Sequence, residues 1–347
     1  MAVFVHPCNY PPVSTPLDQL NRPLRDLRIS VTDRCNFRCR YCMPAEVFGE
    51  DYDYLPKPEM LTHEEIAALA GVICSQGVKK IRLTGGEPLL RRGLPELIRM
   101  LKEIPGERDI AMTTNGTILA RNANNLKKAG LHRVTISLDA LNPEIFSRMN
   151  GVGATPDRVI DGIDSALDHG LGVKINTVVQ KGVNESEILP LAEFARDRGV
   201  TLRYIEFMDT GNTNRWKLDQ VVSSAVLLGK LRAEYDLAVS EPKVGETATR
   251  YHHVDAPEVE IGFISSVSQP FCRDCNRARL SADGQLFTCL FAAQGHDLKT
   301  SLRSGASDEK MADLIRNVWS ARDDRYSELR SEIDGAQDKP EMSYIGG

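Results

Sequence analysis

The sequence predicts an α/β protein, a partial, TIM-like (β/α)6 barrel followed by a C-terminal extension. Six short runs rich in β-branched residues alternate with helical patterns between residues 27 and 208, as in parallel strands joined by crossover helices. This alternation also fits a doubly wound sheet. Thr84, Thr113 and Ser137, however, stand near the ends of three runs, and barrels carry their chemistry at the carboxyl ends of their strands. The polar strand ends therefore favour the barrel.

The elements follow one another in a regular order. The predicted strands are 27–32, 80–84, 110–114, 134–138, 173–178 and 202–207. Apolar residues at helical spacing predict helices between them, at 66–73, 94–104, 122–129, 157–169 and 187–198. The first helix is preceded by Thr62 and Glu65, which have the spacing of a capping box. Each strand is thus expected to have a helix after it.

The pattern changes after residue 208. We expect a loop at 211–215, a helix at 221–235, irregular or strand-like chain at 249–266 and a helix at 308–322. These changes divide the chain into four parts. They are a Pro-rich N-terminal arm (1–21), the barrel (22–210), the extension (211–335) and a tail (336–347).

Charge and hydropathy exclude several classes of partner. The chain has 43 Lys and Arg against 48 Asp and Glu, a formal net charge of −5. An acidic chain is a poor general binder of nucleic acid or anionic membrane, so a polyanionic ligand needs a local basic cluster. No apolar run reaches the length that spans a bilayer, and residues 1–23 lack the pattern of a secretory signal. We expect a cytoplasmic protein with no nucleic-acid polymer and no membrane as partner.

Six of the eight cysteines fall into two groups. In a reducing compartment such groups favour metal ligation over disulfides. Cys74 lies on the apolar face of the first predicted helix and is expected in the core, whereas Cys8 lies in the arm and receives no role.

The first group follows the first predicted strand with C-x3-C-x2-C spacing, and its members are Cys35, Cys39 and Cys42. There is no fourth cysteine nearby. An electron-transfer iron–sulfur cluster takes four thiolates, so three would leave one iron open, as in a catalytic metal centre. The alternative is a zinc site of the Cys3His type completed by His63.

The second group is also a trio, consisting of Cys272, Cys275 and Cys289. Its spacing does not separate a second cluster from a structural zinc site completed by His296. Arg277 and Arg279 are two residues apart, so they share one face of an extended segment and could clamp a phosphate chain. A structural zinc site would not require this pair of arginines.

The first trio resembles the motif of the radical S-adenosylmethionine (SAM) superfamily. Tyr41 stands at the aromatic position before the last cysteine, and the sequence TGGEP at 84–88 ends the second predicted strand. The resemblance implies a [4Fe–4S] cluster whose open iron is chelated by SAM and whose electron releases a 5′-deoxyadenosyl radical. Glycines at 85 and 86 would let the main chain approach the cofactor closely.

Within that superfamily the chain resembles the GTP 3′,8-cyclase family, which starts molybdenum cofactor biosynthesis. The resemblance runs from about Arg22 to the terminal Gly-Gly. The segments that carry it are LRISVTDRCNFRC at 27–39, KIRLTGGEP at 80–88, TTNG at 113–116, SLDA at 137–140, EFM at 206–208, SSVSQ at 265–269, RDDRYS at 322–327 and GG at 346–347.

The family resemblance implies a role for each matching residue. The second trio would ligate a second [4Fe–4S] cluster whose open iron binds the guanine of GTP. The GTP contacts would be Arg28, Arg82, Thr113, Lys174, Arg277, Ala278 and Arg279. The SAM contacts would be Tyr41, Gly86, Ser137 and Met208. The catalytic residues would be Arg277, Arg279, Gly346 and Gly347, because the Gly-Gly tail of this family enters the active site beside the arginines.

The implied reaction begins when the adenosyl radical abstracts hydrogen from ribose C3′. The C3′ radical would then add to guanine C8, and an electron and a proton would complete (8S)-3′,8-cyclo-7,8-dihydroguanosine 5′-triphosphate. The implied partners are GTP, a reductase that donates electrons, the cyclic pyranopterin monophosphate synthase that acts on the product, and a second copy of the chain in a homodimer. The alternatives are a radical SAM enzyme that modifies peptides and a non-catalytic iron–sulfur or zinc-binding protein.

Overall fold

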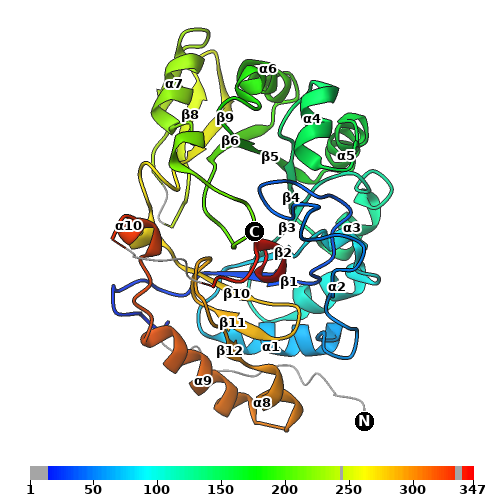
Figure 1. Cartoon of the computed structure of the whole chain (residues 1–347). Helices are drawn as coiled ribbons and strands as arrows, with labels where there is room; N and C mark the ends of the chain where they lie inside the picture. The colour runs from blue at the N-terminus through cyan, green and yellow to red at the C-terminus, as the bar shows by residue number, and fades with distance from the viewer. Residues whose placement is uncertain (1–14, 243–244, 333–337) are drawn as a thin grey trace.

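The parallel strands curve around the centre of the molecule, with most helices outside them (Figure 1). The computed structural model describes residues 15–242, 245–332 and 338–347. Among these residues one sheet has twelve strands, in the order β12-β11-β10-β1-β2-β3-β4-β5-β6-β9-β8-β7. The run from β10 through β1–β6 to β9 is parallel throughout. The prediction of a partial barrel of β–α units is therefore confirmed.

The six central strands are those expected from the sequence, displaced by at most two residues. They are β1 (Asp26–Ser30), β2 (Lys80–Thr84), β3 (Asp109–Thr114), β4 (Arg133–Ser137), β5 (Gly172–Val179) and β6 (Thr201–Glu206). Side chains alternate between two environments along them. On β5, for example, Val173 and Ile175 are buried toward the helices, whereas Lys174 and Asn176 face the other way and are half-buried.

Six helices cover the outer face of these strands (Figure 1). They are α1 (His63–Ser75), α2 (Leu94–Glu103), α3 (Ala123–Ala129), α4 (Pro143–Asn150), α5 (Asp157–Asp168) and α6 (Ile188–Asp197). In the capping box before α1, Glu65 N donates to Thr62 Oγ1 (3.2 Å) and Thr62 N donates to Glu65 Oε2 (2.8 Å). Cys74 is buried in the same helix. The sequence analysis did not predict α4, although Asn142 followed by Pro143 is a helix-start signal.

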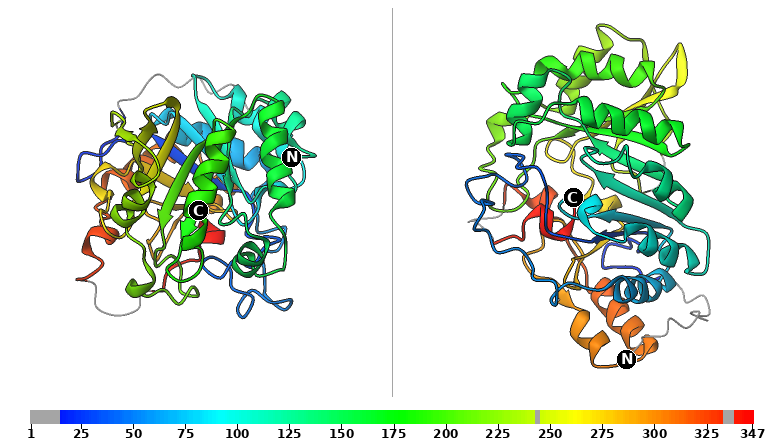
Figure 2. Two further views of the ribbon diagram at one scale, coloured as in Figure 1. Left: turned by 90° about the horizontal axis from the view of Figure 1, so that it is seen from above. Right: turned by 90° about the vertical axis from the view of Figure 1, so that its right-hand side faces the viewer.

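The chain after β6 adds strands to both edges of the curved sheet. At one edge, α7 (Ser224–Arg232), β7 (Leu237–Val239) and β8 (Thr249–His253) precede β9 (Ala256–Ile264), which pairs parallel with β6. At the other edge β10 (Arg277–Leu280) pairs parallel with β1, and β11 (Gln285–Phe287) and β12 (His296–Asp297) follow it. The two edges lie at opposite ends of the molecule (Figure 2).

The last helices pack around the β10 edge and the centre. They are α8 (Lys299–Arg303), α9 (Asp308–Ser320), α10 (Tyr326–Leu329) and α11 (Met342–Ile345). Helix α9 packs against α1, and α11 lies in the middle of the ring of strands (Figure 1). Within the described residues, no helix combines the length and apolar character that crossing a membrane requires.

Both predicted terminal segments are partly described. Residues 1–14, which include Cys8, and residues 336–337 lie outside the described part of the chain. From Thr15 to Asn21 the predicted arm folds back on the protein instead of extending, because Leu17 bridges to Pro23 and Asp18 is buried. At the other end, Ile345 is fully buried.

Candidate active site

The inner face of the curved sheet carries a row of arginines. In the register of the parallel strands, Arg28 on β1 lies between Arg82 on β2 and Arg279 on β10. Arg82 and Arg279 are buried, whereas Arg28 and Arg277 are half-buried. These side chains face a cavity at the centre of the sheet. The strand pairing thus brings together cations from the two ends of the sequence.

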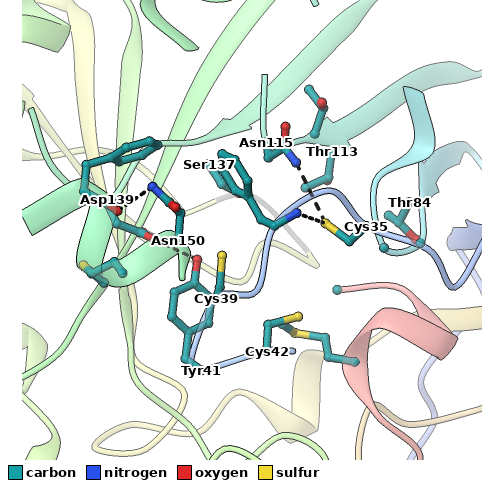
Figure 3. Close-up of a pocket in the computed structure, with 18 residues that line it drawn as sticks. Cys35, Cys39, Tyr41, Cys42, Thr84, Thr113, Asn115, Ser137, Asp139 and Asn150 are labelled. Carbon is teal, nitrogen blue, oxygen red and sulfur yellow. Dashed lines mark hydrogen bonds between the residues drawn. The ribbon is translucent and has the colours of Figure 1, made fainter. Parts of the chain in front are cut away.

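The first part of this cavity, which we call the first lobe, contains the first cysteine trio. It has a volume of about 120 Å³, and its lining includes Cys35, Cys39, Cys42, Tyr41, Gly86, Thr113 and Ser137. The three sulfur atoms lie around one space (Figure 3). Tyr41 Oη donates to Asp139 Oδ2 (2.7 Å), and Val178 N donates to Asp139 Oδ1 (2.9 Å). Asp139 therefore ties the cysteine loop to β5.

Two glycines allow the loop after β2 to pack against the loop of Cys35. Gly86 N donates to Thr32 O (2.8 Å), and a Cβ at Gly86 would collide with Arg34 O. Gly85 has φ 136°, and a Cβ there would collide with Thr32 O. The sequence analysis explained these glycines by a close approach to cofactor. The structure adds a second reason, which is close packing of backbone against the cysteine loop, and the contact with cofactor stays a prediction.

A buried carboxylate, that of Glu87, connects the loop after β2 to β3. Glu87 is fully buried and accepts hydrogen bonds from Thr114 Oγ1 and Asn115 N, both at 2.7 Å. Burial raises the pKa of Glu87 to about 7. Asn115 Nδ2 in turn donates to Asn36 Oδ1 (2.8 Å) in the cysteine loop. The TGGEP segment, β3 and the first trio are thus one connected unit.

The thiols of the first trio lie in a setting that favours the protonated form. Burial raises the pKa of Cys35 to about 11, with a smaller contribution from Glu87. Burial also raises the pKa of Cys39 and of Cys42. The nearby Cys35 raises the pKa of both further. Only a bound cationic group would hold all three as thiolates. Three clustered thiols that need a cation fit an iron–sulfur cluster.

The second lobe of the cavity contains the second trio. It has a volume of about 230 Å³, and its lining includes Cys272, Cys275, Cys289, Arg28, Arg82, Arg277, Arg279, Thr113 and Met208. Burial alone would raise the pKa of Cys275, but Arg277 and Arg322 lower it to about 6. Burial raises the pKa of Cys289 to about 12. One thiol of this trio is therefore prepared as a thiolate by its neighbours.

The cations of the second lobe repel one another. Burial, Arg277 and Arg82 lower the pKa of Arg28 to about 9, and burial lowers that of Arg82 to about 10. Arginine nevertheless stays protonated near neutral pH. Among the residues that the structure describes, the buried Nε atoms of Arg28, Arg82 and Arg203 have no hydrogen-bond partner. Free donors and unbalanced positive charge in one cavity fit a polyanionic ligand.

The two lobes adjoin one another and share part of their walls. The residues that line both are Tyr41, Thr113, Ser137, Asp139, Met342 and Gly347. Gly346 O accepts a hydrogen bond from Arg279 Nη1. Gly346 has φ 79°, and a Cβ there would collide with Thr84 Oγ1. The C-terminal residue thus lies at the junction of the lobes, beside the arginines.

Three of the residues implied by the family resemblance do not line the cavity, namely Lys174, Ala278 and Gly346. Ala278 is 1% exposed and packs in the core, so only its backbone is available. Lys174 shares the face of β5 with Asn176, two residues nearer the start of the strand. Met208 lines the second lobe and not the first.

Sequence reasoning missed several residues of the cavity. Arg203 on β6 lines the second lobe and donates to Thr135 Oγ1 (3.2 Å), which also accepts from Arg82 Nη1 (3.0 Å). The alternation of β6 was a usable signal, because Arg203 and Ile205 share its half-buried face. Asp139 had no such signal, since its partner Tyr41 is 98 positions away.

The histidines of the zinc alternatives lie away from both trios. His63 is at the start of α1, 3.4 Å from Arg91 Nε, and His296 is exposed on the edge strand β12. Neither lines a lobe. In the described part of the chain, no three His, Cys, Asp or Glu side chains have the mutual spacing of a single-ion site.

Known proteins resemble the chain in both sequence and fold. The profile of the Radical SAM superfamily matches residues 29–195, and that of Molybdenum Cofactor Synthesis C matches residues 200–328. GTP 3′,8-cyclases of Acidothermus cellulolyticus and Staphylococcus carnosus are each 48% identical to it, over 95% of this chain and 98% of theirs. Crystallised Streptococcus suis SuiB bound to SAM has a similar fold, with a TM-score of 0.59 and 17% identity over 90% of this chain and 69% of its own.

The curved parallel sheet, together with the cysteine trio beyond its first strand, defines a radical SAM enzyme. The near-full-length identity is more specific than the fold. The chain belongs to the GTP 3′,8-cyclase family.

The packing of Gly86 against the cysteine loop can be tested by substitution. Gly86→Ala should weaken SAM binding roughly tenfold or more, because overpacking costs about 1–3 kcal/mol and the collision is with the backbone at Arg34. Gly229→Ala is the matched control, since a Cβ at that helical position meets nothing within 4 Å. Equilibrium binding of SAM to the reconstituted proteins measures the effect. Wild-type affinity in Gly86→Ala would show that the contact does not matter.

Proposed function

We propose that the chain converts GTP to (8S)-3′,8-cyclo-7,8-dihydroguanosine 5′-triphosphate, the first step of molybdenum cofactor biosynthesis. In this proposal the first lobe takes a [4Fe–4S] cluster and SAM, and the second lobe takes GTP and a second [4Fe–4S] cluster. The observation that carries the proposal is that the two lobes adjoin and share six lining residues. A group bound in the first lobe would face a substrate bound in the second.

The first lobe suits its proposed occupants by its donor set. Cys35, Cys39 and Cys42 would ligate the cluster and leave one iron for SAM. When bound, the cluster and SAM supply a carbon radical that abstracts hydrogen. The protein's part is to orient SAM through Tyr41 and Ser137 and to keep the lobe enclosed. Tyr41 is held for this task by Asp139.

The second lobe suits a nucleoside triphosphate. Arg28, Arg82 and Arg203 offer unpartnered buried N–H groups, which match phosphate oxygens. Joining ribose C3′ to guanine C8 requires that these two atoms be held in register. The cations would anchor the triphosphate, and Cys272, Cys275 and Cys289 would hold the cluster at the base end. Arg277 and Arg279 would contact the substrate from the wall of the second lobe, and Gly347 would lie where the two lobes adjoin.

Other parts of the proposal come from the family alone. A reductase that donates electrons, a cyclic pyranopterin monophosphate synthase that uses the product, and a homodimer all stay predictions. The cytoplasm suits the protein, because two trios of reduced thiols require a reducing compartment. A peptide as substrate is less favoured, because the second lobe is lined by arginines.

The direct test of this function is anaerobic reconstitution with iron and sulfide, followed by incubation with a chemical reductant such as dithionite, SAM and GTP. We expect one product with the mass of GTP and the carbon–carbon bond between C3′ and C8, formed together with 5′-deoxyadenosine. If 5′-deoxyadenosine formed while GTP stayed unchanged, the chain would be a radical SAM enzyme that acts on a different substrate. Lack of 5′-deoxyadenosine would reject the radical chemistry altogether.

The tail prediction concerns the last two residues. Deletion of Gly346 and Gly347 should lower cyclisation by about a hundredfold or more, since misplaced groups near reacting atoms cost that much, while both clusters and SAM binding stay intact. Product formation, iron content and SAM affinity are measured on the same preparation. Full cyclisation by the shortened chain would contradict a role for the tail.

The pH prediction concerns Lys174. Burial, with Arg203 and Arg133, lowers the pKa of Lys174 to about 8, so its charge is present below pH 8 and lost above it. If Lys174 binds the triphosphate, the KM for GTP should rise about tenfold from pH 7 to pH 9. Lys174→Met should have a high KM at pH 7 and a flatter profile. A wild-type profile in Lys174→Met would remove this residue from the GTP site.

A further inference from the structure

A buried group of three charged side chains lies behind the second cysteine trio. Asp18 Oδ2 accepts hydrogen bonds from Arg22 Nε (2.6 Å) and from Arg322 Nη1 (3.0 Å). The side chains of Asp18, Arg22 and Arg322 are 0%, 2% and 1% exposed. None of them lines either lobe. They belong to neither the substrate site nor the first cluster site.

The two guanidinium groups donate to the backbone of all three cysteine segments. Arg22 Nη1 donates to Cys272 O (2.6 Å), and Arg322 Nη1 donates to Cys275 O (2.8 Å). Arg322 Nε donates to Thr288 O (3.1 Å), the carbonyl of the residue before Cys289. Two of these cysteines lie in the stretch 272–275, and the third, Cys289, follows after 13 intervening residues. One pair of arginines is therefore hydrogen-bonded to both stretches.

The carboxylate orients this pair. Asp18 Oδ1 accepts from Leu20 N (2.9 Å) and from Arg22 N (2.8 Å), which fixes the carboxylate itself. Two buried guanidinium groups so close together would repel one another without a negative charge between them. Trp319 Nε1 donates to Arg22 O (3.0 Å) and so joins α9 to the N-terminal segment. The group is a clamp built from the two ends of the sequence.

We propose that Asp18, Arg22 and Arg322 are positioning residues for the second iron–sulfur cluster, because they hold the backbone of its three cysteine segments in the ligating arrangement. This inference rests on the proposed function, since it takes the second trio to ligate a cluster. The planar fork of arginine is needed because Arg322 donates to Cys275 O and to Thr288 O, which lie in different stretches of the trio. Lysine keeps the charge, but its ammonium group lacks the planar fork that fixes two N–H groups toward these two carbonyls.

The experiment counts iron in two backgrounds of the full-length chain. In the first, Cys35, Cys39 and Cys42 are replaced by Ala, so all bound iron belongs to the second site. We expect about four irons per chain, and less than half of that after Arg322→Lys, with faster removal of the remainder by EDTA. Arg316→Lys is the control, because Arg316 lies on α9 and pairs with Asp313 near the surface.

The second background replaces Cys272, Cys275 and Cys289 by Ala. Here Arg322→Lys should keep about four irons at the first site and the ability to bind SAM, which shows that the barrel is folded. Asp18→Asn, which keeps the shape of the side chain and removes its charge, should give the same selective loss. Absorption and EPR spectra of the reduced clusters identify which site has been lost.

Two results would overturn the positioning role. One is unchanged iron content and EDTA resistance in both Arg322→Lys and Asp18→Asn in the first background. The other is an equal loss of iron in the two backgrounds, which would mean that the group serves the whole fold. If the first background took up no iron before any further substitution, the second cluster of the proposed function would itself be wrong, and the inference would fail with it.

Discussion

The active site depends on arginine side chains that lie close together on the inner face of a curved sheet, with only part of their positive charge balanced by the protein. Arg28, Arg82 and Arg279 occupy adjacent register positions on three parallel strands, and each has its charge disfavoured by burial. Asp26, whose pKa falls to about 2 next to Lys80, Arg28 and Arg82 despite its burial, offsets part of the charge. Buried charge is costly unless it is paired, and a triphosphate is the partner that would offset this cost.

The pairing of β10 with β1 explains how the two cysteine trios come to lie near one row of arginines. Cys35 lies beyond the end of β1, whereas Cys275 lies just before the start of β10. Because these neighbouring strands are parallel, the two trios lie toward opposite ends of the same strand pair. The arginines lie between them on the inner face. In the proposed function, a substrate held there would be reached from one trio at its base and from the other at its sugar, which is the arrangement that an intramolecular ring closure needs.

The sequence was sufficient for the central strands and the two trios, because both depend on local patterns. Runs of β-branched residues that alternate with helical patterns predicted the bounds of β1–β6 within two positions. The spacing of the cysteines indicated which of them form each trio. The strand-like chain expected at 249–266 is β8 and β9, but the places of the edge strands in the sheet were not predictable in this way. The pairing of β10 with β1 joins residues about 250 positions apart, and no local pattern encodes such a contact. For the same reason Asp139 and the clamp of Asp18 with Arg322 emerged only when the chain was folded, whereas the alternation of β6 could have indicated Arg203. The glycines at 85 and 86 were recognised, but backbone packing against the cysteine loop had to be seen in three dimensions.

The central claim is that the two lobes let an atom pass directly from the substrate in one to the cofactor in the other. GTP carrying deuterium at ribose C3′ tests this claim most directly. The reaction is run anaerobically in ordinary water, and the 5′-deoxyadenosine that forms is analysed by mass spectrometry. The account predicts that the deuterium appears in the 5′-deoxyadenosine. Unlabelled 5′-deoxyadenosine, with the deuterium retained in the nucleotide or lost to solvent, would contradict it.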